Sequence, residues 1–241
     1  MQQNNISILS TRPLQTELIK KASEKNIEIE TISFIETKAI EEDSLKKRIL
    51  HLSNHQLTIV FTSMNAIEAV SSYLSNKKVD WKIFCIGSTT KKLVKENFGE
   101  NSVAGTADSA SSLADVIIDQ KSISSVIFFC GDKRRDELPG KLASHNIEVN
   151  EIEVYKTFET PQIVNKNYDA ILFYSPSAVS SFFSINKINA QTILFAIGNT
   201  TANEIKKYAD NKISIGKEPE KELLAEEAIN YFATSSIHHS L

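Results

Sequence analysis

Residues 57–74 read LTIVFTSMNAIEAVSSYL, and this stretch decides the fold class. It begins with Leu57–Phe61, a short apolar run typical of a strand that is buried on both faces. Small polar residues follow, and apolar side chains then recur with helical spacing from Ile67 to Leu74. A strand that passes through a polar loop into a helix is the repeating unit of a parallel sheet covered by helices.

The same unit recurs along the chain. Strand-like apolar runs occur at residues 6–9, 57–61, 81–86, 126–129, 170–173 and 192–197. Stretches with helical spacing of apolar residues lie between them, for example at residues 113–117 and 224–232. This alternation predicts an α/β protein with parallel sheets.

Each strand-like run ends in a loop of small polar residues. These loops are residues 10–13, 62–65, 87–90, 131–134, 175–177 and 198–201. One interpretation is that their Ser and Thr side chains cap the helices that follow. The other is that free N–H groups at the helix starts bind an anionic ligand at the carboxyl edge of each sheet. Six such loops together favour a ligand site over caps alone.

The two halves of the chain are similar in sequence. NIEIE at residues 26–30 matches NIEVN at 146–150, and IGSTT at 86–90 matches IGNTT at 197–201. The spacing between the copies shortens along the chain, which fits the loss of one segment, the helix around Leu45, from the second copy. We therefore expect two similar α/β domains, since a solenoid would need more copies.

Two strand-like stretches, residues 27–40 and 147–158, are too long for a single strand of a small domain. Each can begin as a domain strand and continue as an extended linker. Two such linkers could pair and form the hinge, so we do not expect the domain boundary in the middle of the chain.

The composition is that of an ordinary globular protein, with 41% hydrophobic and 24% charged residues. The net charge of −3 argues against a general nucleic-acid binder. No apolar run reaches the roughly 20 residues of a membrane helix, and the first residues lack a signal-peptide pattern. We therefore expect a cytoplasmic protein with no membrane or nucleic-acid partner, in which Cys85 and Cys130 are reduced, half-buried thiols. No residues have the spacing of metal ligands, and His238 and His239 lie in a polar tail.

The order and spacing of the loops resemble those of the uroporphyrinogen-III synthase family over nearly the whole chain. The resembling segments are residues 10–13, 61–66, 131–138, 153–157, 173–178 and 196–202. The resemblance implies an α/β fold of two similar parallel-sheet lobes, joined by a two-stranded antiparallel linker, with a cleft between them. Lobe one would comprise residues 1–34 plus 158–241 and lobe two residues 35–157, with linker strands near 33–37 and 154–158.

The implied reaction closes the linear tetrapyrrole hydroxymethylbilane into uroporphyrinogen III, with loss of water and inversion of the last pyrrole ring, in haem biosynthesis. The implied enzyme is a cyclising hydro-lyase without metal or organic cofactor, and we expect a monomer. Because the substrate carries many carboxylates, a chain of net charge −3 must bind it through local donors. The expected substrate-binding residues are Thr11, Arg12, Ser63, Asn65, Ser88, Thr89, Gly131, Arg135, Ser175, Ser177, Gly198, Thr200 and Thr201.

Tyr155 matches the tyrosine that the family places on the linker, facing the cleft, and is the expected catalytic residue. Its implied role is to hydrogen-bond or protonate the departing hydroxyl. A phenol is a weak general acid, so its loss should slow the reaction without abolishing it. The alternative is a strand tyrosine whose ring packs and whose hydroxyl bonds to backbone. Likewise, Arg12 could pair with a surface carboxylate, and Thr200 could cap a helix.

Other functions fit the sequence less well. A non-catalytic two-lobed module that binds a small anion would share the repeat and the hinge, but neither a signal peptide nor a basic helix-turn-helix is evident. A nucleotide enzyme would need a glycine-rich phosphate motif. A serine hydrolase would need glycines flanking Ser63 or Ser175. The binding module stays as the alternative.

Overall fold

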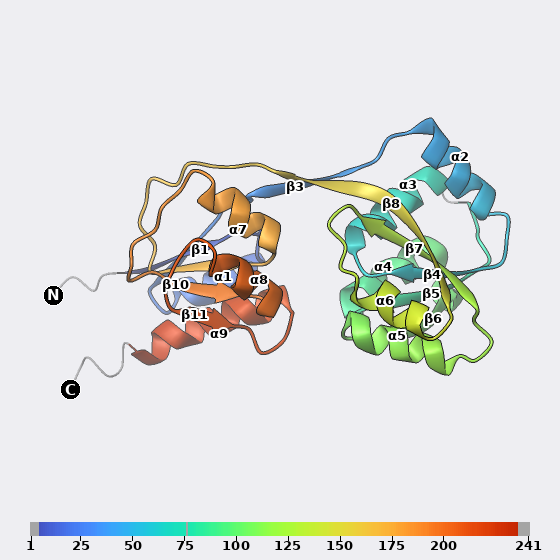
Figure 1. Ribbon diagram of the computed structural model, residues 1–241. Helices are drawn as coiled ribbons and strands as arrows, with labels where there is room; N and C mark the ends of the chain where they lie inside the picture. Colours follow the sequence, from blue (N-terminus) through green and yellow to red (C-terminus); the bar gives the residue numbers. More distant parts are fainter. Residues whose placement is uncertain (1–4, 76, 236–241) are drawn as a thin grey trace. The chain divides into compact units, whose positions relative to one another are not determined.

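The computed structural model describes residues 5–75 and 77–235 (Figure 1). The chain divides into two compact units, and each has its own sheet. Unit 1 takes its described residues from 1–36 and 158–241, and unit 2 takes them from 37–157. The predicted α/β class with two parallel-sheet units is confirmed. His238 and His239 lie outside the described residues.

Unit 1 has a five-stranded sheet in the order β11-β10-β9-β1-β2, and all four pairings are parallel. Its strands are β1 (Ile6–Ser10), β2 (Ile27–Thr31), β9 (Ala170–Phe173), β10 (Ile193–Ala196) and β11 (Ile213–Ile215). Its helices are α1 (Thr16–Ser23), α7 (Pro176–Phe183), α8 (Asn199–Ile205) and α9 (Lys221–Ser235). Helices α1 and α9 pack on one face, around Ile8 and Phe195, while α7 and α8 pack on the other, around Phe173 (Figure 1).

Unit 2 has a six-stranded sheet in the order β3-β8-β7-β4-β5-β6, in which the strands from β8 to β6 pair in parallel. Its strands are β3 (Ile35–Ala39), which begins in unit 1, β4 (Leu57–Phe61), β5 (Trp81–Ile86), β6 (Val103–Ala107), β7 (Ser125–Gly131) and β8 (Glu148–Glu159). Its helices are α2 (Asp43–Leu52), α3 (Met64–Leu74), α4 (Ser88–Phe98), the 3-10 turn η1 (Glu100–Ser102), α5 (Ala110–Asp119) and α6 (Glu137–Ser144). Helices α2, α3 and α4 cover the face around Phe61, and α5 and α6 cover the face around Phe128.

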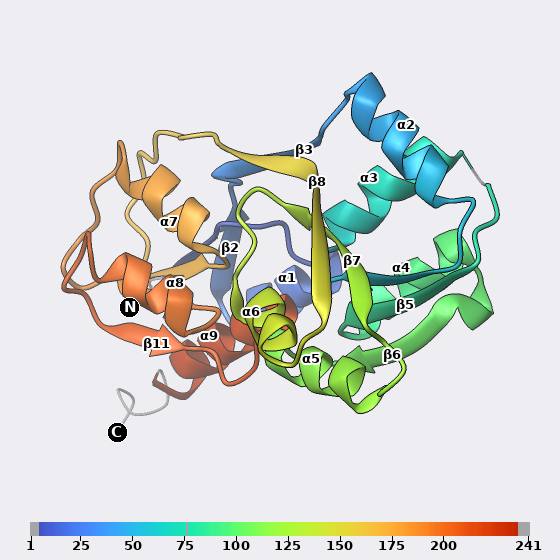
Figure 2. The ribbon, with the colours of Figure 1, turned by 45° about the vertical axis from the view of Figure 1, so that its right-hand side comes forward.

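The chain passes from one unit to the other in β3 and β8. The Ile40 N–H donates to Val154 O (3.0 Å), and the Thr160 N–H donates to Phe34 O (2.9 Å). These partners run in opposite order along the two segments, so the pair is antiparallel. β8 continues for 12 residues as one ribbon (Figure 2). The stretch at 27–40 is instead divided into two strands by a segment that buries Phe34 in the core of unit 1.

Candidate functional site

Each unit gathers three of the predicted loops at one edge of its sheet. Strands β10, β9 and β1 are neighbours in unit 1, and β5, β4 and β7 are neighbours in unit 2. Because parallel strands end at the same edge, the loops that follow them lie close together within each unit. The loops are 10–13, 175–177 and 198–201 in unit 1, and 62–65, 87–90 and 131–134 in unit 2.

Thr11 fixes the first loop of unit 1. It is fully buried, and its hydroxyl donates to Leu172 O (2.7 Å), the same carbonyl that accepts its backbone N–H (3.0 Å). The Ser10 hydroxyl donates to Arg12 O (2.6 Å) and lies 3.3 Å from the Tyr174 hydroxyl. These bonds hold the loop backbone, while the half-buried guanidinium of Arg12 has no hydrogen bond or ion pair within the described residues.

Tyr174 was not among the residues predicted from the sequence. Its side chain is 7% exposed, and burial raises the pKa of its hydroxyl, an effect that Glu222 strengthens and that Ser10 and Arg12 oppose. The phenol therefore stays protonated at neutral pH beside the first loop. The one sequence signal for it was its position within the resembling segment 173–178.

Thr200 and Thr201 differ in their surroundings. Gly198 occupies the N-cap of α8, so neither threonine caps the helix. Thr200 is exposed, whereas Thr201 is fully buried and its Oγ1 has no hydrogen-bond partner within the described residues. A buried hydroxyl without a partner costs about 1–3 kcal/mol. Packing alone therefore does not explain a threonine at position 201.

The loops that follow β4 and β5 in unit 2 leave their polar side chains free of hydrogen bonds to other described residues. Ser63 occupies the N-cap of α3 without a side-chain capping bond, and Gly87 occupies the N-cap of α4. Ser88 and Thr89 are exposed, and Asn65 is half-buried. These hydroxyl and amide groups can therefore bind a ligand without first breaking a contact within the protein.

The capping interpretation is wrong for five of the six loops. Ser175 does cap α7, because its Oγ accepts the Ala178 N–H (3.2 Å). Helices α1, α3, α4, α6 and α8 have no side-chain capping bond at their N-termini. Their first N–H groups lack intrahelical partners and point out of the helix end, where an anion is favoured.

Tyr155 lies directly against the backbone of Gly131. β7 and β8 pair with an irregularity after Cys130, which places Gly131 opposite Tyr155. A Cβ at position 131 would lie 2.3 Å from Tyr155 Cζ and 2.8 Å from the tyrosine hydroxyl. The ring also packs against the hydrophobic core of unit 2. Position 131 therefore needs glycine for this close approach.

Asp132 holds the same part of β8. Its N–H donates to Tyr155 O (3.3 Å), and its Oδ1 accepts the Thr157 N–H (2.9 Å). A carboxylate is a stronger acceptor than a neutral oxygen, so Asp132 fixes the strand immediately after Tyr155. Sequence reasoning did not choose Asp132, although it directly follows Gly131 in a predicted loop.

The two neighbouring arginines of this loop have different roles. Arg134 forms ion pairs with Asp136 and Glu151, and these partners, Asp136 first, raise its pKa. Arg135 is exposed, and within the described residues it has no hydrogen bond or ion pair. Arg135 is thus the guanidinium of the pair that remains open to a carboxylate ligand.

Both cysteines are buried more deeply than the half-buried thiols predicted, with 0% and 2% exposure for Cys85 and Cys130. Burial raises the pKa of Cys85 to about 11 and that of Cys130 to about 12. The thiols are therefore protonated at neutral pH and poor nucleophiles. The described part of the chain has no cluster of three His, Cys, Asp or Glu residues that could hold a metal ion. It also has no helix long and apolar enough to span a membrane.

A repeated α/β architecture with polar loops at the carboxyl edge of each sheet defines a class of two-unit proteins suited to binding a small ligand. The family model described as "Uroporphyrinogen-III synthase HemD" matches residues 16–226. The chain belongs to the uroporphyrinogen-III synthase family.

Individual relatives agree with this membership. Uroporphyrinogen-III synthase of Saccharomyces cerevisiae is 31% identical over a stretch covering 42% of this chain and 42% of the yeast protein, so the match spans less than half of that relative. The solved uroporphyrinogen-III synthetase of Helicobacter pylori is 16% identical, with a TM-score of 0.62 over 94% of this chain and 99% of that chain. A mutant uroporphyrinogen-III synthase of Thermus thermophilus is 13% identical, with a TM-score of 0.60 over 96% and 99%. The two structures show a shared fold.

Proposed function

We propose that this chain catalyses the cyclisation of hydroxymethylbilane to uroporphyrinogen III, a hydro-lyase step of tetrapyrrole biosynthesis. The observation that carries the proposal is the family match over residues 16–226. The fold shared with two solved members of the family supports it. The free hydroxyl groups and helix N-termini of the loops support a substrate rich in carboxylates.

Substrate binding rests on local donors. Helix N-termini and Ser or Thr hydroxyls donate hydrogen bonds to carboxylates without placing bulky cations beside the reacting centre. Of the arginines in the candidate loops, Arg12 and Arg135 have no ion pair within the described residues, and a guanidinium binds a carboxylate with two parallel hydrogen bonds. Together these groups offset the repulsion expected from a chain of net charge −3.

The chemistry begins with loss of the terminal hydroxyl as water, which leaves a cationic azafulvene end. The substituted carbon of the last pyrrole then bonds to that end, and its bond to the neighbouring methylene breaks. The methylene bonds to the free α-carbon of the same ring, which inverts the ring, and that carbon loses a proton, which balances the proton lost with the hydroxyl as water. Tyr155 donates a hydrogen bond to the departing hydroxyl and favours its protonation. The enzyme's larger contribution is to hold the two ends of the chain in the reactive arrangement.

We also propose that the chain acts as a monomer in the cytoplasm and needs no cofactor. Light scattering on a size-exclusion column tests the monomer, and cell fractionation tests the compartment. Full activity of protein dialysed against a chelator would support cofactor independence, whereas recovery of lost activity only on adding back a metal would contradict it.

The test of function is a coupled assay in which hydroxymethylbilane is generated in situ and the products are oxidised and resolved as type I and type III porphyrins. Spontaneous closure gives type I, so the reaction without the protein serves as the blank. We expect protein-dependent type III product and, for Tyr155→Phe, a rate about 10–100-fold lower. Tyr208→Phe is the matched control, because Tyr208 is 45% exposed and stacks on Phe183 away from the loops. Type I product alone from folded protein would refute the proposal and favour the binding module.

A further inference from the structure

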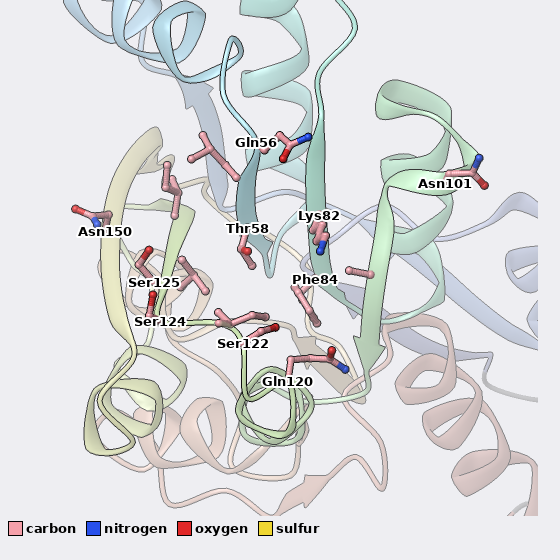
Figure 3. Close-up of a pocket in the computed structure, with 15 residues that line it drawn as sticks. Gln56, Thr58, Lys82, Phe84, Asn101, Gln120, Ser122, Ser124, Ser125 and Asn150 are labelled. Atoms are coloured by element: carbon pink, nitrogen blue, oxygen red, sulfur yellow. The ribbon is translucent and has the colours of Figure 1, made fainter.

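Unit 2 contains a cavity of about 630 Å³ that none of the predicted site residues lines (Figure 3). It lies where β4, β5 and β7 begin, whereas the candidate loops follow the ends of these strands. The cavity is therefore at the opposite edge of the sheet from the candidate site. Its volume is within the range of about 300–1,000 Å³ that small-molecule sites occupy.

The lining of the cavity favours an anion. Of the described residues that line it, Lys82 is the one charged residue. Thr58 is the direct cross-strand neighbour of Lys82, so both side chains lie on the same face. Hydroxyls of the segment between α5 and β7, Ser122 and Ser124, contribute to the lining (Figure 3). The Lys82 ammonium has no hydrogen bond or ion pair within the described residues.

The internal repeat explains why the cavity exists. The register that matches residues 86–90 with 197–201 also aligns Phe84 with Phe195. It aligns the whole of α5 with the first part of α9, residues 221–230. Helix α9 continues to Ser235, but α5 ends at Asp119 and the chain turns into β7. Unit 2 therefore lacks the last helical turn that unit 1 has.

In unit 1 an aromatic side chain from that extra turn, Tyr231, packs beside Phe195, the counterpart of Phe84. The Tyr231 ring packs edge-on against Phe195, with a centroid distance of 6.0 Å and an interplanar angle of 78°. Its hydroxyl accepts a hydrogen bond from Lys212 Nζ (2.9 Å). In unit 2 the equivalent of Phe195, Phe84, lines the cavity instead.

We propose that this cavity binds a small aromatic carboxylate. The aromatic ring takes the place that Tyr231 takes in unit 1, against the wall that contains Phe84. The carboxylate pairs with Lys82 and accepts hydrogen bonds from Thr58 and the serine hydroxyls. The equivalent of Lys82 in unit 1 is Ile193, so unit 1 has no positive charge at this position and unit 2, which contains the cavity, does. The site is independent of the proposed cyclisation.

The experiment titrates the ¹⁵N-labelled full chain with 4-hydroxyphenylacetate and follows the backbone amides by NMR. We expect saturable shifts at Thr58, Lys82 and Ser124, with a Kd of about 1 mM or tighter for a ligand of this size. Lys82→Gln should weaken binding about tenfold. Lys47→Gln, which replaces an exposed residue on α2, should leave the affinity for the ligand unaltered.

A second ligand and a second variant distinguish the contribution of the carboxylate charge to binding from that of the space in the cavity. 4-Methylphenol lacks the carboxylate, so it should bind wild type and Lys82→Gln equally and more weakly than the acid binds wild type. Ala104→Trp places a large ring at the lining of the cavity and should abolish binding of both ligands. The proposal is overturned if the lining amides show no saturable shift, or if Lys82→Gln binds the acid as tightly as wild type does.

Discussion

Replacing Gly131 with alanine tests whether the close approach of Tyr155 matters. The added Cβ would lie 2.3 Å from Tyr155 Cζ and 2.4 Å from Cε2, whereas ordinary contacts begin at 3.4 Å. The tyrosine ring must therefore move by about 1 Å in a close-packed environment. Overpacking of this kind lowers the free energy of unfolding by about 1–3 kcal/mol.

Under the proposed function the displaced ring should also slow the reaction. A misplacement of about 1 Å can cost about 100-fold in rate, so we expect kcat for type III formation to fall by about that factor while KM changes less. Initial rates come from the coupled porphyrin assay, and calorimetry gives Tm. If Gly131 acts through the Tyr155 hydroxyl, the double variant with Tyr155→Phe should be no slower than Gly131→Ala alone.

Gly140→Ala is the matched control. Gly140 lies in α6, and no atom lies within 4 Å of the position its Cβ would take. Alanine should stabilise the helix by up to about 1 kcal/mol and leave the rate unchanged. The reasoning fails if Gly131→Ala keeps the rate and the Tm of wild type, because the position of the Tyr155 ring would then not depend on the absence of a side chain at residue 131.

Three further predictions concern single groups. Thr201→Val removes a buried hydroxyl without a described partner, so calorimetry should show unchanged or higher stability, while the porphyrin assay should show lost type III synthesis; full activity would mean that the hydroxyl does not contact substrate. Asp132→Ala should speed hydrogen exchange of the Thr157 amide about tenfold or more, and Asp132→Asn, which keeps an acceptor, should restore most of the protection. Burial raises the pKa of Cys130 to about 12, whereas an unfolded thiol ionises near about 8.5, so the stability contributed by this thiol is complete below about pH 8.5 and is lost as pH rises toward 12. Cys130→Ala should therefore flatten the decline of Tm above pH 8.5, and an identical slope in both proteins would contradict the assigned shift.

The buried strands could be predicted because helices cover both faces of each sheet. In β7 every residue from Val126 to Gly131 is buried, so the apolar run is continuous and easy to recognise. The edge strands at residues 103–107 and 213–215 were missed. They are short, partly exposed and have a weak pattern, VAGTA and ISI. Edge strands of native sheets are commonly short and polar, so their apolar pattern is weak.

The stretch at 27–40 illustrates a different limit. Its composition predicts extended chain throughout, and most of it is extended. Which sheet each part joins depends on partners far away in sequence, since β2 pairs with β1 and β3 lies beside β8. The break is set by Phe34, which packs edge-on against Phe182 with ring centroids 5.2 Å apart. A local pattern cannot reveal a contact over such a separation.

The candidate loops were predictable, but the state of each side chain within them was not. Six loops of small polar residues follow from the strand–helix alternation alone. That Ser175 caps a helix and Ser63 does not depends on backbone angles that the sequence leaves open. The contact between Gly131 and Tyr155 depends on the irregularity in the pairing of β7 and β8, and such a shift is set by tertiary packing.

The two units fix their loops by different contacts that have the same physical effect. Unit 1 uses the Thr11 hydroxyl on a neighbouring strand, and unit 2 uses the Asp132 carboxylate on the backbone of β8. A loop that such contacts already hold in place does not have to be ordered when a ligand binds, so less conformational entropy is lost. Its helix N-termini then present neutral donors in fixed positions. Under the proposed function, each unit thus offers preorganised donors for carboxylate groups, whose binding the net charge of −3 alone would disfavour.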